Sequence, residues 1–179
     1  PQVVVVHPSL PVKNIRELVA LAKAKPGELS YGSSGNGAIN HLAGELFNYM
    51  TGTKLVHVPY KGGGPAAVAL ISGEIALILG EPATLVGHIK AGKVRALAVT
   101  SEKRSMFLPD LPTVAESGVP GYDVTSWNGM LAPAAIPGDI VRRLNGEYNR
   151  IIADGEMKSI SSETTFETSG EGTLLEELE

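Results

Sequence analysis

The sequence predicts an α/β fold built on a mainly parallel sheet. Strand-like and helix-like segments alternate through the first hundred residues, and the links between them are short. The helical segments also carry apolar residues at the spacing of one helix face. Strands that alternate with helices pair in parallel through right-handed crossovers. We therefore expect a parallel sheet with helices on both of its faces.

Each expected element has its own local signal. Val3–Val6 has the continuous β-branched composition of a strand buried on both faces. Asn14 is a suitable N-cap for a helix that runs to Lys25. Pro65 and Pro82 suit the first residue of a helix. The other strands are expected at 29–31, 55–58, 75–79 and 95–100, and the other helices at 38–50, 65–72 and 82–92.

The pattern changes after residue 101. Several prolines and glycines fall within about twenty residues, which is too many breakers for a regular helical layer. Residues 102–125 are therefore expected to form a long connection. A strand is expected at 127–131, and a helix from Pro137 to Ile152 with a face of apolar residues. A short helix, a strand and a terminal helix are expected within 156–179.

Composition excludes several classes of function. A net charge of −4 argues against a nucleic-acid surface, which needs a basic face. The absence of cysteine excludes disulfides and cysteine-based zinc sites, and the four histidines lack the spacing of metal ligands. We expect no metal and no cofactor. No apolar run is long enough to span a membrane, and the N-terminus does not resemble a signal peptide. The chain begins inside a strand, as if cut from a longer protein.

The glycine-rich segment Gly32–Gly37 is the most informative candidate site. It follows a strand and opens a helix, so its backbone N–H groups lie at the positive end of a helix dipole. Ser33, Ser34 and Asn36 would add side-chain donors. The spacing of these glycines fits neither a dinucleotide fingerprint nor a P-loop. The alternatives are an anion site and a turn that only caps the helix.

Two further candidates follow the next strands. Lys61 lies in a second glycine-rich loop, before the helix that contains Pro65. Glu81 follows the strand at 75–79 and precedes Pro82. Loops after successive parallel strands gather at one edge of the sheet, where ligands bind. Lys61 is equally consistent with a solvated lysine, and Glu81 with a carboxylate that caps a helix.

Four blocks of sequence together resemble the Bug family, the periplasmic solute receptors of tripartite tricarboxylate transporters. They read YGSSGNGAINHLAGELF (31–47), HVPYKG (57–62), GKVRALAVTS (92–101) and LPDLPTVAESGVPGY (108–122). The resemblance extends in order from Gln2 to Asn149 and weakens after Ile152. It implies a two-lobed fold of the type II periplasmic-binding-protein class, which closes on a small organic acid. It also implies a periplasmic location and membrane transporter subunits as partners.

The resemblance implies a division of the chain as well. Residues 8–101 would form the ligand-binding α/β lobe, 102–125 the connection, and 126–179 with 1–7 a remnant of the other lobe. The opening part of that other lobe, with its own ligand-binding loop, would be missing, so this piece is expected to self-associate or to leave its C-terminal part poorly anchored. The ligand contacts carried over from the family are Ser33, Ser34, Gly35, Asn36, Gly37, Lys61, Gly80 and Glu81. Gly80 stands where the family usually has an aromatic residue.

Two other functions share parts of this pattern. The effector domain of a transcription regulator can have the same fold, but it would need a DNA-binding head, and no basic recognition helix is visible here. Since such a head could lie in a part absent from this sequence, the four block matches are what decide against this alternative. An enzyme acting on acyl or phosphoryl groups would need a nucleophile with a base, and none can be assembled from the sequence. We therefore expect a receptor for a small carboxylate with no catalytic residues.

Overall fold

A computed structural model describes residues 1–106, 108–126, 132–133 and 135–153. The chain divides into two compact units, Pro1–Ser126 and Trp127–Glu179, and each is described here by itself. The first unit contains all the candidate site residues. The second unit contains one described helix, α5. The strand expected at 127–131 and the elements expected within 156–179 lie outside the described residues.

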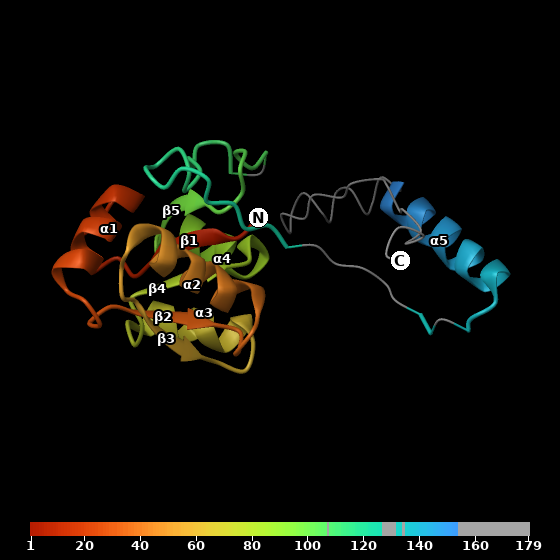
Figure 1. The fold of residues 1–179 in the computed structure, drawn as a ribbon, viewed down its shortest axis with the longest axis horizontal. Helices are drawn as coiled ribbons and strands as arrows, with labels where there is room; N and C mark the ends of the chain where they lie inside the picture. The colour runs from red at the N-terminus through yellow and green to blue at the C-terminus, as the bar shows by residue number, and fades with distance from the viewer. Residues whose placement is uncertain (107, 127–131, 134, 154–179) are drawn as a thin grey trace. The chain divides into compact units, whose positions relative to one another are not determined.

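The first unit is built on a single sheet of five strands in the order β3-β2-β4-β1-β5 (Figure 1). Strands β2 and β3 pair in parallel, and so do β2 and β4. Strand β1 pairs antiparallel with both of its neighbours, β4 and β5. The strands are β1 (Val3–Val6), β2 (Ser30–Ser33), β3 (Val56–Pro59), β4 (Leu77–Gly80) and β5 (Arg95–Val99).

The direction of β1 corrects one expectation from the sequence. The strand pairs formed within residues 8–101 are parallel, as predicted, but β1 runs antiparallel to both of its neighbours and makes the whole sheet mixed. Val3–Val6 is part of this sheet, and its assignment with residues 126–179 to another lobe of the longer family protein stays a prediction. Val6 lies opposite Leu77, the first residue of β4, so β1 ends at the edge of the sheet where β2 and β4 begin. Helix α1 then returns the chain to that same edge. A run of valines buried on both faces fits this antiparallel central strand as well as a parallel one.

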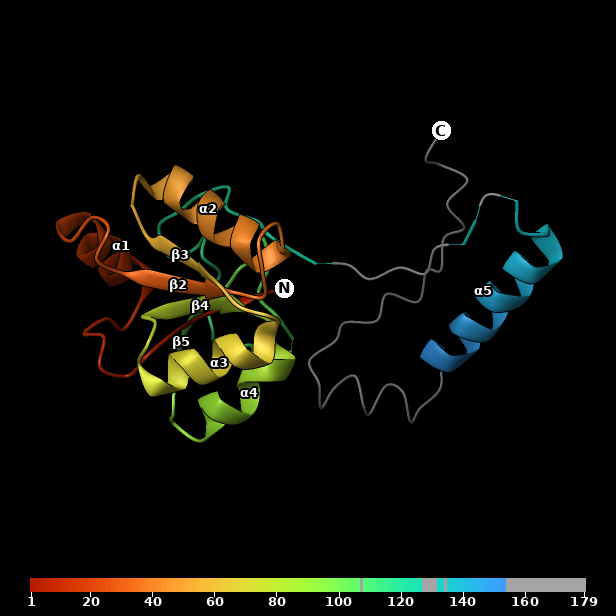
Figure 2. The ribbon, with the colours of Figure 1, turned by 90° about the horizontal axis from the view of Figure 1, so that it is seen from below.

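Helices cover both faces of the sheet, as the sequence predicted (Figure 2). Val4 and Val6 face the core shared with α1 and α2, whereas Val3 and Val5 face the core shared with α3 and α4. The α/β class is therefore confirmed. The helices are α1 (Ile15–Ala24), α2 (Ile39–Thr51), α3 (Gly63–Ser72) and α4 (Pro82–Lys90).

Helix α2 lies unusually close to the sheet because Gly44 has no side chain. A Cβ atom on Gly44 would overlap the ring of Tyr31 on β2. The Tyr31 ring fills that space, and its hydroxyl donates to the backbone oxygen of His41 and to Glu45 Oε1. Burial, followed by the bond to Glu45, raises the pKa of Tyr31. This contact fixes the first half of α2, and with it the helix N-terminus, above the end of β2.

The connecting segment 102–125 packs on the sheet and is part of the first unit. Thr113 forms a parallel bridge with Val99 of β5, and the N–H of Val124 donates to the oxygen of Thr100. Tyr122 is fully buried, and its hydroxyl donates to the oxygen of Ala43 at 2.8 Å. The lobe boundaries expected at 8–101 and 102–125 stay predictions for the longer family protein.

In the second unit, α5 (Gly138–Ala153) begins one residue after Pro137, close to its predicted start. Its apolar face is between 41% and 50% exposed. The self-association expected from this face stays a prediction. Among the described residues, no helix has the length and apolar character needed to cross a membrane. The residues of the exposed face are Ile140, Leu144, Tyr148 and Ile151.

Candidate functional site

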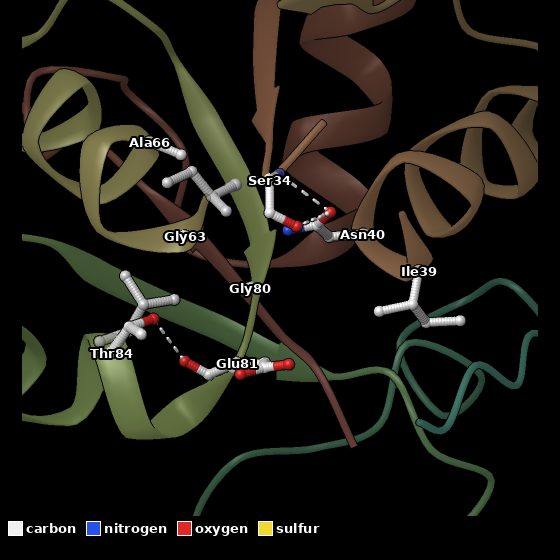
Figure 3. A pocket seen from close by; sticks show the side chains of 10 residues that line it. Ser34, Ile39, Asn40, Gly63, Ala66, Gly80, Glu81 and Thr84 are labelled. Atoms are coloured by element: carbon white, nitrogen blue, oxygen red, sulfur yellow. Dashed lines mark hydrogen bonds between the residues drawn. The ribbon is translucent and has the colours of Figure 1, made fainter. Parts of the chain in front are cut away.

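A pocket of about 180 Å³ lies at the edge where β2 and β4 end and α2, α3 and α4 begin (Figure 3). Drug-sized ligands occupy pockets of roughly 300–1,000 Å³, so this space suits a smaller molecule. Ser34 and Asn40 lie on the side of β2 and α2, and Glu81 and Thr84 on the side of β4 and α4. The lining residues are Ser34, Ile39, Asn40, Gly63, Ala66, Ile78, Gly80, Glu81, Thr84 and Leu85.

Asn40 is the central polar group on the α2 side. It is 5% exposed, and its Oδ1 accepts from the backbone N–H of Ser34 at 3.1 Å and from the Ser34 hydroxyl at 3.0 Å. Its amide nitrogen makes no hydrogen bond within the described part of the chain. Asn40 therefore fixes the end of β2 and keeps an uncommitted N–H₂ donor. The sequence did not single it out, because an asparagine inside a helix gives no signal until its partner is known.

Ser33 is buried and holds the shape of the glycine loop. Its Oγ accepts from the N–H of Gly35 at 3.1 Å, lies 3.0 Å from the oxygen of Gly35, and shares a 2.6 Å hydrogen bond with His57 Nε2. Both Ser33 and Ser34 were expected to offer hydroxyl donors to a ligand. In the structure the Ser33 hydroxyl donates to the oxygen of Gly35 and the Ser34 hydroxyl donates to Asn40, and both bonds position the backbone. Their contact with a ligand stays a prediction.

A stacked pair of histidines supports the same loop from outside. The His41 and His57 rings lie 3.9 Å apart, and His41 Nδ1 accepts from the N–H of Gly37 at 3.0 Å. Burial, and then the neighbouring His41, lowers the pKa of His57, while Glu45 acts in the opposite direction. The observed hydrogen bond of His41 requires an unprotonated Nδ1. The observed loop geometry therefore depends on Nδ1 of His41 acting as a hydrogen-bond acceptor.

The three helices that begin at the pocket lack side-chain caps. Their N-cap residues are Ala38, Gly62 and Glu81, and none of these side chains bonds to the helix. The first turns of α2, α3 and α4 also contain no acidic residue. Within the described residues, the first N–H groups of α2 and α3, at Ile39 and Gly63, have no hydrogen-bond partner. Such N–H groups, at the positive ends of helix dipoles, suit an anion.

Gly80 and Glu81 shape the opposite wall. A Cβ atom on Gly80 would lie 2.8 Å from Leu85 Cδ1, so a larger residue here would displace Leu85 from the pocket wall. The backbone oxygen of Glu81 accepts from the Thr84 hydroxyl at 2.9 Å. The Glu81 carboxylate has no hydrogen bond or ion pair with any described residue. It is therefore not the capping carboxylate that the sequence left open as an alternative.

The structure brings only part of the predicted site together. Ser34, Gly80 and Glu81 line the pocket, whereas Ser33, Gly35, Asn36, Gly37 and Lys61 do not. Asn36, Gly37 and Lys61 are exposed, and Gly35 takes a positive φ of 141° that favours glycine. These residues stay predicted ligand contacts. Among the described residues, no three His, Cys, Asp or Glu side chains are grouped closely enough to hold a metal ion.

Sequence comparison identifies related proteins along nearly the whole chain. The family described as the tripartite tricarboxylate transporter family receptor matches residues 1–169. A UPF0065 protein from the tcbD-tcbE intergenic region of Pseudomonas sp. is 37% identical over 171 residues, which are 95% of this chain and 51% of that protein. The chain spans about half the length of the curated relatives it matches.

Solved structures give the same result. A protein of R. palustris with adipate has a TM-score of 0.87 at 38% identity, covering 92% of this chain and 55% of that one. The periplasmic binding protein BugD has a TM-score of 0.84 at 34% identity, with 91% and 55% covered. MatC from Rhodopseudomonas palustris with bound malate has a TM-score of 0.85 at 26% identity, with 92% and 56% covered.

These matches confirm the resemblance inferred from the four sequence blocks. They favour a solute-binding receptor over both an enzyme and the effector domain of a regulator, because the family is one of receptors and the related folds are periplasmic binding proteins. The chain belongs to the tripartite tricarboxylate transporter receptor family.

Proposed function

We propose that this chain forms the carboxylate-binding part of a periplasmic receptor, which captures a small organic acid and delivers it to the membrane subunits of a tripartite tricarboxylate transporter. Family membership supports the receptor role, and two related structures hold the dicarboxylates adipate and malate. The chain itself supports the type of ligand through the pocket at the carboxyl ends of β2 and β4.

One observation carries this proposal: three helices begin at the pocket without side-chain caps. Each helix N-terminus carries about half a positive charge on its free N–H groups. Elsewhere in a protein, such groups find water or a side chain. Here they line a space that also contains the uncommitted amide nitrogen of Asn40. A bound carboxylate would satisfy these donors together.

The remaining lining residues explain how a small acid would bind without a basic side chain. Ile39, Ala66 and Leu85 supply apolar surface for the carbon skeleton of the ligand. Closing such a wall over the ligand excludes water and strengthens each N–H···O⁻ hydrogen bond. Neutral donors also release their ligand more easily than a buried ion pair would, which suits a receptor that must deliver its cargo.

The test is a calorimetric titration of the full-length gene product with adipate and with malate. Asn40→Ala removes a buried donor and the brace on Ser34, so affinity for a bound acid should fall by about tenfold or more, equivalent to ~1.5–3 kcal/mol for a hydrogen bond to a charged group. Asn14→Ala, at the N-cap of α1 and away from the pocket, is the matched control and should leave affinity unchanged. Equal affinity of the Asn40 variant and the unmodified protein would remove the pocket from the proposal.

Location and delivery need a separate experiment in cells. Fractionation should place the full-length protein in the periplasm, and deletion of its gene should abolish uptake of the acid that it binds. Uptake that continues at the normal rate would separate binding from transport by this receptor.

A further inference from the structure

Glu81 is the only charged residue among those that line the pocket. Its side chain is exposed to the pocket, does not cap α4, and makes no ion pair or hydrogen bond within the described residues. A carboxylate placed next to a bound organic acid repels it unless a proton or a cation lies between them. The pocket therefore combines donors for an anion on one side with an unpartnered acceptor on the other.

The arrangement of the two sides makes this combination specific. In Figure 3, Ser34 and Asn40 lie at one side of the space, with Glu81 and Thr84 across from them. The Thr84 hydroxyl is already engaged by the backbone oxygen of Glu81. Glu81 is therefore the free polar group on the α4 side, and it can only accept hydrogen bonds when ionised.

We propose that the natural ligand of this pocket is a carboxylate bearing a hydrogen-bond donor, a hydroxyl or an ammonium group, and that Glu81 receives this donor. The inference rests on the proposed function, because it assumes that the ligand's carboxylate binds at the helix N-termini. It goes further by making Glu81 the residue that selects substituted acids over plain ones. A plain acid would leave Glu81 facing either a carboxylate or an apolar chain, and both are unfavourable.

A substitution that removes the charge of Glu81 distinguishes a ligand hydroxyl from a ligand ammonium group. A hydroxyl needs only an acceptor, and the side-chain oxygen of glutamine provides one. An ammonium group needs the negative charge as well, because hydrogen bonds between two ionised groups are much stronger than those between neutral groups. Glu81→Gln should therefore lower the affinity for a hydroxy acid by a few-fold and the affinity for an amino acid by at least about tenfold.

The experiment uses the full-length protein and matched dicarboxylates of four, five and six carbons, each in its plain, 2-hydroxy and 2-amino form. Affinities are measured by titration calorimetry for the unmodified protein, Glu81→Gln, Glu81→Ala and the control Glu28→Gln. Glu28 pairs on the surface with Lys25 at 3.3 Å and does not line the pocket, so its variant makes the same charge change away from the site.

We expect the unmodified protein and the Glu28 variant to bind one substituted form at least about tenfold more tightly than the plain acid of the same length. Glu81→Ala should reduce that ratio to about one. If acids bind but without this preference, or if Glu81→Ala keeps it, the inference is wrong and the proposed function still stands. If the unmodified protein binds none of the acids, both are wrong. Circular dichroism of each variant checks that a lost preference is not a lost fold.

Discussion

The N-terminus of α1 is capped by nearby side chains, whereas the N-termini of α2, α3 and α4 have no side-chain cap. In α1, Asn14 Oδ1 accepts from the N–H of Glu17 at 2.9 Å, while the Glu17 carboxylate accepts from the N–H of Lys13 at 2.7 Å and from the Asn14 side chain at 2.8 Å. Asn14 and Glu17 therefore cap the start of α1 reciprocally. The other three helices have neither a side-chain cap nor an acid in the first turn.

The two kinds of N-terminus lie at opposite edges of the sheet. Helix α1 follows β1, which ends where β2 and β4 begin, whereas α2 and α4 follow the ends of β2 and β4. Side chains of the chain itself bond at the start of α1, whereas the first N–H groups of α2 and α3 stay open beside the pocket that contains Asn40. This difference supports the proposal that the uncapped ends receive an external anion, since each missing cap forgoes about 1 kcal/mol of stability.

The largest effect on ligand affinity is expected when the start of α2 is given a carboxylate. Asn40→Asp keeps the oxygen that accepts from Ser34 but replaces the free N–H₂ donor with a negative charge beside the ligand. Affinity for adipate or malate, measured by calorimetry, should fall by at least about 100-fold, or ~3 kcal/mol. Asn14→Asp makes the same chemical change at the N-cap of α1 and should leave affinity as it was. Similar losses in both variants would mean that the two helix ends do not differ in function.

A second substitution tests how α2 is held above the sheet. A methyl group on Gly44 would overlap the Tyr31 ring, so Gly44→Ala should lower the free energy of unfolding by about 2–3 kcal/mol, as overpacking of a core does. Gly87→Ala in α4 is the control, because nothing lies within 4 Å of its added Cβ. That control should be neutral or stabilising by up to about 1 kcal/mol in denaturant unfolding. Equal effects of the two changes would contradict the close approach of α2.

Removing the cap of α1 should have a smaller effect on stability. Asn14→Ala deletes the acceptor for the Glu17 N–H and the donor to its carboxylate, and should cost about 1 kcal/mol of unfolding free energy. Chemical denaturation measures this loss. Because the change is far from the pocket, affinity for the acids should not move. A fall in affinity as large as that for Asn40→Ala would erase the distinction between the capped and open helices.

The smallest expected effect concerns pH. His57 has a folded-state pKa below its ordinary 6.5, because of its burial and the adjacent His41. The unfolded chain therefore binds a proton more readily, so stability is present above pH 6.5 and decreases as the pH falls below it. Thermal unfolding between pH 7 and 5 should show this slope, and His57→Gln should reduce it. An unchanged slope in that variant would assign the pH dependence to other groups.

The sequence predicted most of this fold because its signals are local. The Asn14 cap, the apolar spacing of α1 and the glycines after β2 each act within a few residues, and the structure contains the corresponding elements. The predicted direction of β1 was wrong, because a run of four valines indicates that a strand is buried but not in which direction it runs. Direction depends on where the chain returns, which is a long-range property.

The candidate site was predicted less completely for a related reason. Glycines and serines after a strand indicated the edge of the sheet where the pocket lies, and Glu81 was identified there from its position. Asn40 was missed, since its role depends on pairing with Ser34 six residues earlier. The serine hydroxyls were expected to face a ligand, but Ser33 donates to the oxygen of Gly35 and Ser34 donates to Asn40 of α2. A sequence lists donors without showing which are already satisfied.

The most direct test of the account is a titration of the ¹⁵N-labelled full-length protein with malate, and separately with adipate, followed through backbone amide shifts. We expect the amides of Ile39, Gly63 and Ala83, in the first turns of α2, α3 and α4, to shift together along one saturable curve. The amides of Ile15 and Arg16, in the first turn of the capped helix α1, should stay in place. Saturable shifts at α1 with none at the three open helices would contradict the central claim that the uncapped helix ends bind the ligand carboxylate.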